Sequence, residues 1–324
     1  MQDDPGVTGP VWLPTAPASL ETMLAPTLQP VPVLPVLAVV LLVLYLAGAC
    51  RLWLRGRRWS IGATISFTVG CVVLALVTGA GIEGYGLRLF SAFMFQQLTL
   101  MMLVPPLLVL GRPGTLLLRA TPHRGVGTVV LVTARRALRS RVSRVVLHPA
   151  VMVPLFLLAF YGLYLAELAD PLLRTWTGHL ALEVGFLVAG LLSTDPLPIR
   201  QTHHGRALDL LLEMPLHAFF GVIVMMATAP MVPLFAAPPA GWGIDPLRDQ
   251  QLAGGLAWSY GEAPGLLMLL LIASRWQRND TERSTARDRQ IDRDGGADAE
   301  LEQYNAYLAR LNGSRPSGAP PAQP

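Results

Sequence analysis

The hydrophobic positions of this chain gather into long unbroken runs, and few of them follow the spaced pattern of a soluble amphipathic helix. About 20 residues in a helix cross the ~30 Å hydrocarbon core of a bilayer, and seven runs approach or exceed that length. The seven stretches are Val33–Leu52, Ile61–Ala80, Leu89–Leu110, Val146–Leu168, His179–Leu197, Leu210–Phe235 and Leu252–Ala273. The pattern predicts an all-α, polytopic membrane protein with seven transmembrane helices.

Composition agrees with this prediction, and the arginines give an orientation. The chain is 52% hydrophobic and 14% charged, whereas soluble domains carry about 25% charged residues. All 25 basic residues are arginines; 22 lie on one predicted side of the membrane and 3 on the other. By the positive-inside rule the 22 face the cytoplasm. The N-terminus is then outside and the C-terminus cytoplasmic, in a multi-pass protein of the cell (inner) membrane.

Three parts follow from this topology. Residues 1–30, rich in proline and threonine, are expected to form a disordered extracytoplasmic tail. Residues 31–275 form the seven-helix transmembrane domain, and residues 276–324 a charged cytoplasmic tail in which apolar residues at helical spacing favour a short helix. Within the transmembrane domain, residues 113–145 are basic and amphipathic, which is typical of a segment on the inner membrane surface that binds anionic lipid. Because the arginines follow the membrane sides, the net charge of +4 does not indicate a nucleic-acid partner.

The third stretch contains two polar residues and a break. Gln96 and Gln97 lie inside it, and Pro105 and Pro106 interrupt it before its exit at Gly111–Gly114. An amide in lipid needs a hydrogen-bond partner, so these side chains are expected to face protein or a cavity. A hydrogen bond between helices is one interpretation, and a direct functional role is the other.

Ionisable residues inside predicted spans are candidates for function, because they are costly to place in a membrane. The candidates are His148, His179, Glu183, Glu213, His217 and Glu262. His179 and Glu183 are four positions apart and share a helix face, which suits either a metal ligand with its supporting carboxylate or a structural pair. Glu213 and His217 repeat that spacing. His148 lies near the inner edge and His179 near the outer edge, so these two cannot share one ion.

Other chemistry is sparse in the sequence. Several methionines, Met94 among them, lie in the third and sixth spans, where a thioether suits Cu(I) but is also ordinary packing. The spans contain no paired carboxylates, no HExxH motif and no Ser/His arrangement. We therefore do not expect an enzyme.

A series of motifs connects the chain to a known family. The segments FSAFMFQQLTLMMLVPPLLVLGRPGTLLLRATP, GHLALEVGFLVAG, EMPLHAFFGVIVM and DPLRDQQLAGGLAWSYGEAP occur in this order between about Arg57 and Leu311. Together they resemble the multi-span cytochrome c oxidase assembly factor CtaG family, in an actinobacterial-like branch. The resemblance implies an assembly factor for haem-copper oxidases that aids copper delivery or subunit maturation. Its partners would be cytochrome c oxidase subunits or other assembly factors.

The sequence departs from the family at the histidines. In the family pattern, histidines stand at the places that correspond to positions 93, 97, 179 and 185, all in the outer halves of their spans. The resemblance therefore implies that these histidines could converge on one metal site. This chain has Phe93, Gln97 and Gly185 there and keeps only His179, while His148 and His217 match the pattern. One reading has copper bound by His179 and Met94. The others are a metal-free paralogue that acts as a membrane scaffold, and a copper or small-solute transporter.

Overall fold

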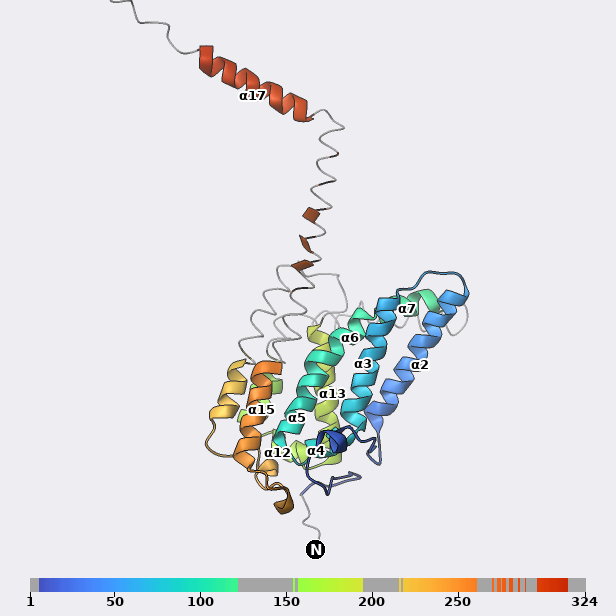
Figure 1. The fold of residues 1–324 in the computed structure, drawn as a ribbon, viewed down its shortest axis with the longest axis vertical. Helices are drawn as coiled ribbons and strands as arrows, with labels where there is room; N and C mark the ends of the chain where they lie inside the picture. The colour runs from blue at the N-terminus through green and yellow to red at the C-terminus, as the bar shows by residue number, and fades with distance from the viewer. Residues whose placement is uncertain are drawn as a thin grey trace, which may run out of the picture. The chain divides into compact units, whose positions relative to one another are not determined.

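In the computed structural model the named elements of the described part are all helices (Figure 1). The structure describes residues 6–121, 154, 157–194, 216, 218–260 and 296–313, together with single positions between 270 and 289. By its contacts the chain divides into two units, Met1–Leu269 and Leu270–Pro324. Among the described residues no strand occurs, and the only β-pairing is an isolated bridge between Thr8 and Thr175. The predicted all-helical class is confirmed.

Four helices are long and apolar enough to cross a membrane. They are α2 (Val33–Leu54), α3 (Ile61–Gly79), the interrupted helix Phe90–Ala120 and α13 (Trp176–Ser193). These four correspond to the first, second, third and fifth predicted spans. The other three predicted spans lie partly outside the described residues, so the total of seven and the orientation stay predictions.

The interrupted helix changes its winding where the sequence requires it. It begins as α5 (Phe90–Leu98), widens into the π-helical turn η1 (Thr99–Leu103) and continues as α6 (Val104–Leu110). Pro105 has no N–H to donate one turn back, and a π-turn just before it accommodates the missing bond. The helix breaks at Arg112, which takes a left-handed conformation with φ of 52°, and α7 (Pro113–Ala120) then follows. This break agrees with the exit predicted at Gly111–Gly114.

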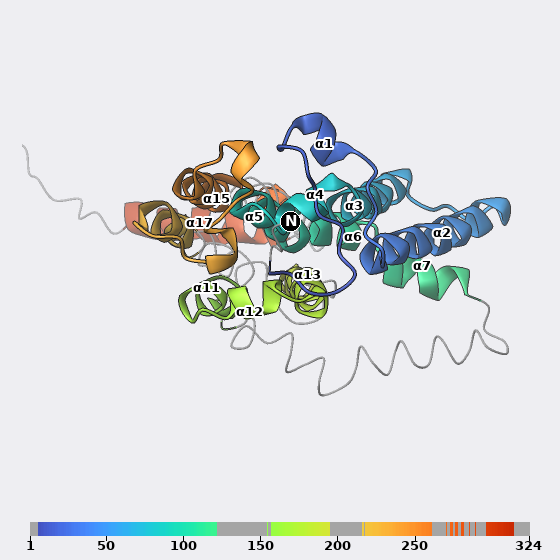
Figure 2. The ribbon, with the colours of Figure 1, turned by 90° about the horizontal axis from the view of Figure 1, so that it is seen from below.

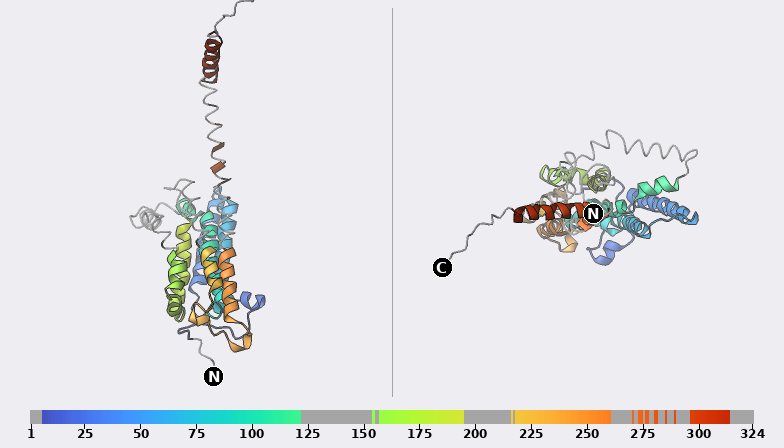
Figure 3. Two further views of the ribbon diagram at one scale, coloured as in Figure 1. Left: turned by 90° about the vertical axis from the view of Figure 1, so that its left-hand side faces the viewer. Right: turned by 90° about the horizontal axis from the view of Figure 1, so that it is seen from above.

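The α5–α6 segment is the centre of the first unit. It packs against α3, α13 and α15 (Pro246–Tyr260), and Figure 2 shows α5 between these neighbours. A glycine allows α13 to approach η1 closely. A Cβ atom on Gly190 would lie 2.6 Å from Cγ of Pro105 and closer still to the carbonyl oxygen of Met101. The side view in Figure 3 shows these helices running alongside one another.

A carboxylate from α15 holds the start of the central helix. Leu89, at the N-cap of α5, makes no side-chain capping bond. Instead, Oδ2 of Asp249 accepts hydrogen bonds from the backbone N–H groups of Phe90 (2.6 Å) and Ser91 (3.3 Å), and Oδ1 accepts one from the Ser91 hydroxyl. Free N–H groups at a helix start need an acceptor, and a negative charge there also complements the helix dipole.

We call the end of the first unit that carries α4 (Gly81–Gly86) and α12 (Ala169–Leu173) the α4 end. Residues 6–32 lie across it, where the sequence predicted a disordered tail. The backbone N–H of Thr8 donates to the carbonyl of Arg174 (2.7 Å), and Gln29 pairs with both backbone groups of Trp12. Trp12 packs so closely on Gly84 that a Cβ there would meet its ring at 2.5 Å. The structure differs from the prediction because these contacts satisfy backbone groups that the sequence alone leaves without partners.

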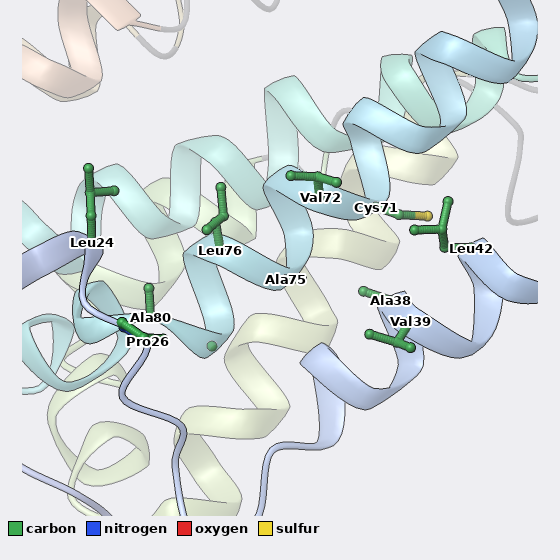
Figure 4. Close-up of a pocket in the computed structure, with 11 residues that line it drawn as sticks. Leu24, Pro26, Ala38, Val39, Leu42, Cys71, Val72, Ala75, Leu76 and Ala80 are labelled. Atoms are coloured by element: carbon green, nitrogen blue, oxygen red, sulfur yellow. The ribbon is translucent and has the colours of Figure 1, made fainter.

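An apolar hollow of about 250 Å³ lies between α2 and α3 (Figure 4). Its lining includes Leu24, Ala38, Leu42, Cys71, Ala75 and Leu76. Cys71 is buried beside this hollow and Cys50 is exposed, and both thiols are free. The lining offers hydrocarbon contact without a charged side chain, as a surface that faces lipid tails would.

The second unit contains α17 (Gly296–Gly313). This helix confirms the short helix that apolar spacing predicts in the tail. Its apolar residues Leu301, Tyr304, Leu308 and Leu311 are all exposed.

Candidate functional site

Three ionisable side chains meet inside the first unit, near the α4 end. They are Glu83 from α4 and His179 and Glu183 from α13, and their exposed fractions are 5%, 3% and 4%. One ligand atom from each lies within 4.8 Å of the others. A histidine with two carboxylates at this separation is an arrangement that could hold a metal ion. We call these three residues the Glu–His–Glu cluster.

Local structure explains how the three side chains meet. The hydroxyl of Thr175 caps α13 by accepting from the N–H of Gly178 at 3.1 Å, which fixes the first turn of that helix. His179 and Glu183 then lie one turn apart on its buried face. Glu83 comes from the other side, on a short helix that starts after the chain leaves α3 in an extended conformation at Ala80.

The cluster is held by a network that includes a glutamine. Nε2 of His179 lies 3.1 Å from Oε1 of Glu83 and 3.9 Å from Oε1 of Glu183. The side-chain amide of Gln96, 1% exposed, donates to Glu183 Oε1 at 2.7 Å and also to Glu83 Oε2. It also lies 3.3 Å from the carbonyl of Val77. Gln96 therefore links the two carboxylates.

The electrostatics of the cluster are unbalanced if both carboxylates are charged. Two buried carboxylates repel each other and have lost their hydration, while the one imidazole offers at most one positive charge. A proton or a metal ion must therefore compensate them. A small cavity of about 20 Å³ adjoins the cluster and is lined by all three residues together with Gln29 and Thr78. That volume is about enough for one water-sized ligand.

Sequence reasoning found His179 and Glu183 but missed their two partners. Glu83 lies in the short connection between two predicted spans, where a carboxylate is unremarkable in sequence. A lone acidic residue in the otherwise apolar run GIEGYGL was the available signal. For Gln96 the sequence left open a hydrogen bond between helices or a direct functional role, and the structure shows its amide bonded to both carboxylates.

Gln97, the other glutamine of this span, connects helices. It is fully buried, accepts a hydrogen bond from the hydroxyl of Tyr164 and donates to the carbonyl of Ala159 at 3.3 Å. Ala159 lies in the π-helical turn η2 (Leu158–Gly162), where the wider winding leaves carbonyl groups available. These bonds are the helix–helix link that an amide in an apolar span predicts.

Two of the four positions expected to converge do so, and two do not. Phe93 faces the cluster, with its ring centroid 6.0 Å from that of His179. Gln97 bonds elsewhere, and Gly185 is exposed, with no atom within 4 Å of where its Cβ would stand. The expected convergence therefore does not hold for positions 97 and 185. The six residues from His179 to Gly185 turn position 185 to another face of α13, and the Gln97 side chain bonds to Tyr164 and Ala159 instead of reaching the cluster.

The remaining predicted residues divide into two groups. Met94 is fully buried in the main hydrophobic core beside Leu98, and its role as a ligand stays a prediction. The others lie outside the described residues: His148, Glu213, His217, Glu262 and most of the basic segment 113–145.

The fold and the site define a helical membrane protein that encloses a polar cluster near one end. The chain belongs to the cytochrome c oxidase caa3 assembly factor family (Caa3_CtaG), whose model matches residues 43–279. This confirms the family that the motif series indicates.

The chain also resembles three mycobacterial proteins that are themselves uncharacterized. Those of Mycobacterium bovis and Mycobacterium tuberculosis are 36% identical over 288 residues, and that of Mycobacterium leprae is 33% identical over 287. The matches cover 86% of this chain but 43% of each relative, so the chain spans less than half of their length. No solved structure matches the chain.

The cluster can be tested against the copper that the family resemblance implies. Cu(I) prefers thiolate and thioether ligands. The cluster offers one imidazole and two carboxylates instead. The residues gathered here therefore do not fit a Cu(I) site.

Proposed function

We propose that this protein is an integral membrane assembly factor for cytochrome c oxidase that holds an oxidase subunit during its maturation. The observation that carries the proposal is the family match over residues 43–279, which includes all four of the long apolar helices in whole or in part. The proposal includes seven spans in the cell membrane, an extracytoplasmic N-terminus and a cytoplasmic C-terminus. In that orientation the Glu–His–Glu cluster lies toward the extracytoplasmic face.

The exposed faces of the apolar helices support a role in binding membrane subunits. On α2 the exposed side chains include Val36, Val39, Val40, Val43 and Leu44. Helices of a partner subunit can pack on such a face as readily as lipid does. A subunit held in this way would be kept from wrong contacts until it joins the oxidase.

Packing of the central helix favours assembly over transport. A transporter needs a polar route through the membrane. Beyond Gln97 the described part of the central helix has one buried polar side chain, Thr99, and continues with Leu100, Val104 and Leu108, all of them buried. Along this described stretch a solute would meet mainly hydrocarbon.

Deleting the gene tests the proposal. We expect oxidase activity and the levels of assembled oxidase subunits to fall, and a plasmid copy of the gene to restore both. Succinate dehydrogenase activity in the same membranes serves as the control for general damage. Normal oxidase activity with full subunit levels in the deletion strain would refute the proposal.

A second arm separates copper delivery from subunit maturation. If the protein supplies copper, added copper in the growth medium should partly restore oxidase activity in the deletion strain. If it holds a subunit, added copper should leave both activity and subunit levels low. We expect the second result, because the cluster lacks the sulfur ligands that Cu(I) prefers.

A further inference from the structure

We propose that Glu83, His179 and Glu183 bind one divalent first-row transition-metal ion such as Zn²⁺, and that Gln96 is the residue that positions the two carboxylates. The ion would be bound through one imidazole nitrogen and carboxylate oxygens. This inference is separate from the oxidase role and concerns only what the cluster binds.

Charge balance is the first argument. The two carboxylates are each at least 95% buried, and their charges would be uncompensated in a medium of low dielectric constant. A divalent ion neutralises both carboxylates at once, whereas a monovalent ion leaves one negative charge. In the described part of the chain, the ion-pair contacts of both carboxylates are with His179 and not with an arginine.

The orientation of the imidazole is the second argument. Nε2 of His179 points at oxygens of both carboxylates, at 3.1 Å from Glu83 and 3.9 Å from Glu183. Three electron-rich atoms facing one another need a cation or a proton between them. His179 Nδ1 has no hydrogen-bond partner among the described residues. With an ion in the site, Nδ1 would carry the ring hydrogen and the Nε2 lone pair would face the metal.

Gln96 supplies the third argument. Its Nε2 donates to both carboxylates and leaves acceptor lone pairs on each, which is how an outer-shell residue holds metal ligands in place. Its Oε1 is buried without a hydrogen-bond partner within the described part of the chain. Burying Oε1 without a partner costs free energy, and the bonds from Nε2 to Glu83 and Glu183 offset that cost.

The adjoining cavity completes the site. Its volume of about 20 Å³ suits one water molecule as a further ligand, beside the three protein side chains. Gln29 and Pro32 from the segment across the α4 end also line this cavity. That segment covers the site, so an ion would enter from the α4 end when it moves aside.

The donor set distinguishes the site from the copper site that the family resemblance suggests. Imidazole with carboxylates suits Zn²⁺, Mn²⁺ and Fe²⁺, and Cu²⁺ binds most nitrogen and oxygen sites strongly. Cu(I), which prefers sulfur, is the ion that this site disfavours. Binding of Zn²⁺ together with weak binding of Cu(I) is therefore the signature that we expect.

The test uses the full chain purified in detergent and stripped of metal with a chelator. Equilibrium dialysis with Zn²⁺, followed by elemental analysis, should give one ion per chain. Each of Glu83→Gln, His179→Gln and Glu183→Gln should weaken binding by at least the ~10–100-fold that loss of an outer-shell partner costs, and Gln96→Leu by about that factor. The control Glu167→Gln removes an exposed carboxylate and should leave the affinity unchanged. Thermal unfolding of each variant shows whether it remains folded.

A spectrum of the unaltered protein provides a test that needs no variant. Co²⁺ added in place of Zn²⁺ should give visible bands typical of nitrogen and oxygen ligands, without the sulfur-to-metal band of a thiolate. Three results would overturn the proposal. They are no stoichiometric Zn²⁺ on the unaltered chain, equal affinity in the folded Glu183→Gln variant, and Cu(I) under anaerobic reducing conditions bound more tightly than Zn²⁺.

Discussion

Nε2 of His179 lies 3.1 Å from Oε1 of Glu83, although 96 positions separate the two residues. The contact joins α13 to α4, and Phe93 of the central helix closes the site from a third side. The cluster is therefore a product of tertiary packing among three segments. A substitution at a neighbouring position should therefore change metal binding by the cluster only if the new side chain points toward it.

A histidine at position 93 should strengthen metal binding. Phe93→His places a second imidazole beside His179, since the two rings already lie 6.0 Å apart between centroids. We expect tighter Zn²⁺ binding in equilibrium dialysis. Gly185→His is the matched control and should leave binding unchanged, because position 185 is exposed and points away. Tighter binding in Gly185→His alone would contradict the geometry.

Loss of the Asp249 carboxylate should destabilise the protein. Asp249→Asn keeps the size of the side chain but leaves one acceptor oxygen for three donors at the start of α5. We expect the free energy of unfolding to fall by about 1–3 kcal/mol, as for hydrogen bonds to a charged group. Thermal unfolding in detergent measures the change.

Asp245→Asn is the control for that substitution. Asp245 is exposed and accepts from the N–H of Leu247 at the start of α15, the helix that carries Asp249, and asparagine caps about as well as aspartate. If the two substitutions lowered the free energy of unfolding equally, the bonds from Asp249 to Phe90 and Ser91 would not contribute to stability beyond an ordinary helix cap.

Adding one methyl group to α13 should have opposite effects at two of its glycines. Gly190→Ala forces a Cβ against Met101 and Pro105, so α13 must move from the central helix, at a cost of about 1–3 kcal/mol. Gly185→Ala meets no atom and removes a flexible residue from a helix, which should stabilise by about 0.5–1 kcal/mol. Melting temperatures of both variants check the prediction. A neutral Gly190→Ala would mean that the two helices are farther apart than described.

The orientation can be tested with single cysteines. In a chain with Cys50→Ser and Cys71→Ala, a new cysteine at the exposed position Ala237 should react in intact cells with a membrane-impermeant maleimide. A cysteine at the exposed position Arg57, in the connection between α2 and α3, should react only after the membrane is opened. The reverse pattern would invert the orientation that the arginines predict.

The sequence by itself determined the class of the protein and much of its framework. In a bilayer the backbone groups of an apolar run can find hydrogen-bond partners only within a helix, so such runs form helices. The helices α2, α3 and α13 accordingly begin and end within a few residues of the predicted spans. The π-helical turn just before Pro105 is also a local property, because proline lacks a donor wherever it stands. The order of the motifs was enough to identify the family, because motifs can be recognised without knowing which residues are in contact.

Only the tertiary structure decided which polar residues share a site. Helical spacing paired His179 with Glu183, because both lie on one helix face. It could not show that Glu83 joins them or that Gln96 links the carboxylates, because both contacts depend on how separate segments pack. The same holds for the contacts of residues 6–32 with the rest of the chain, such as those of Thr8 with Arg174 and Trp176. Local periodicity describes a single helix, and the cluster exists only where several helices meet.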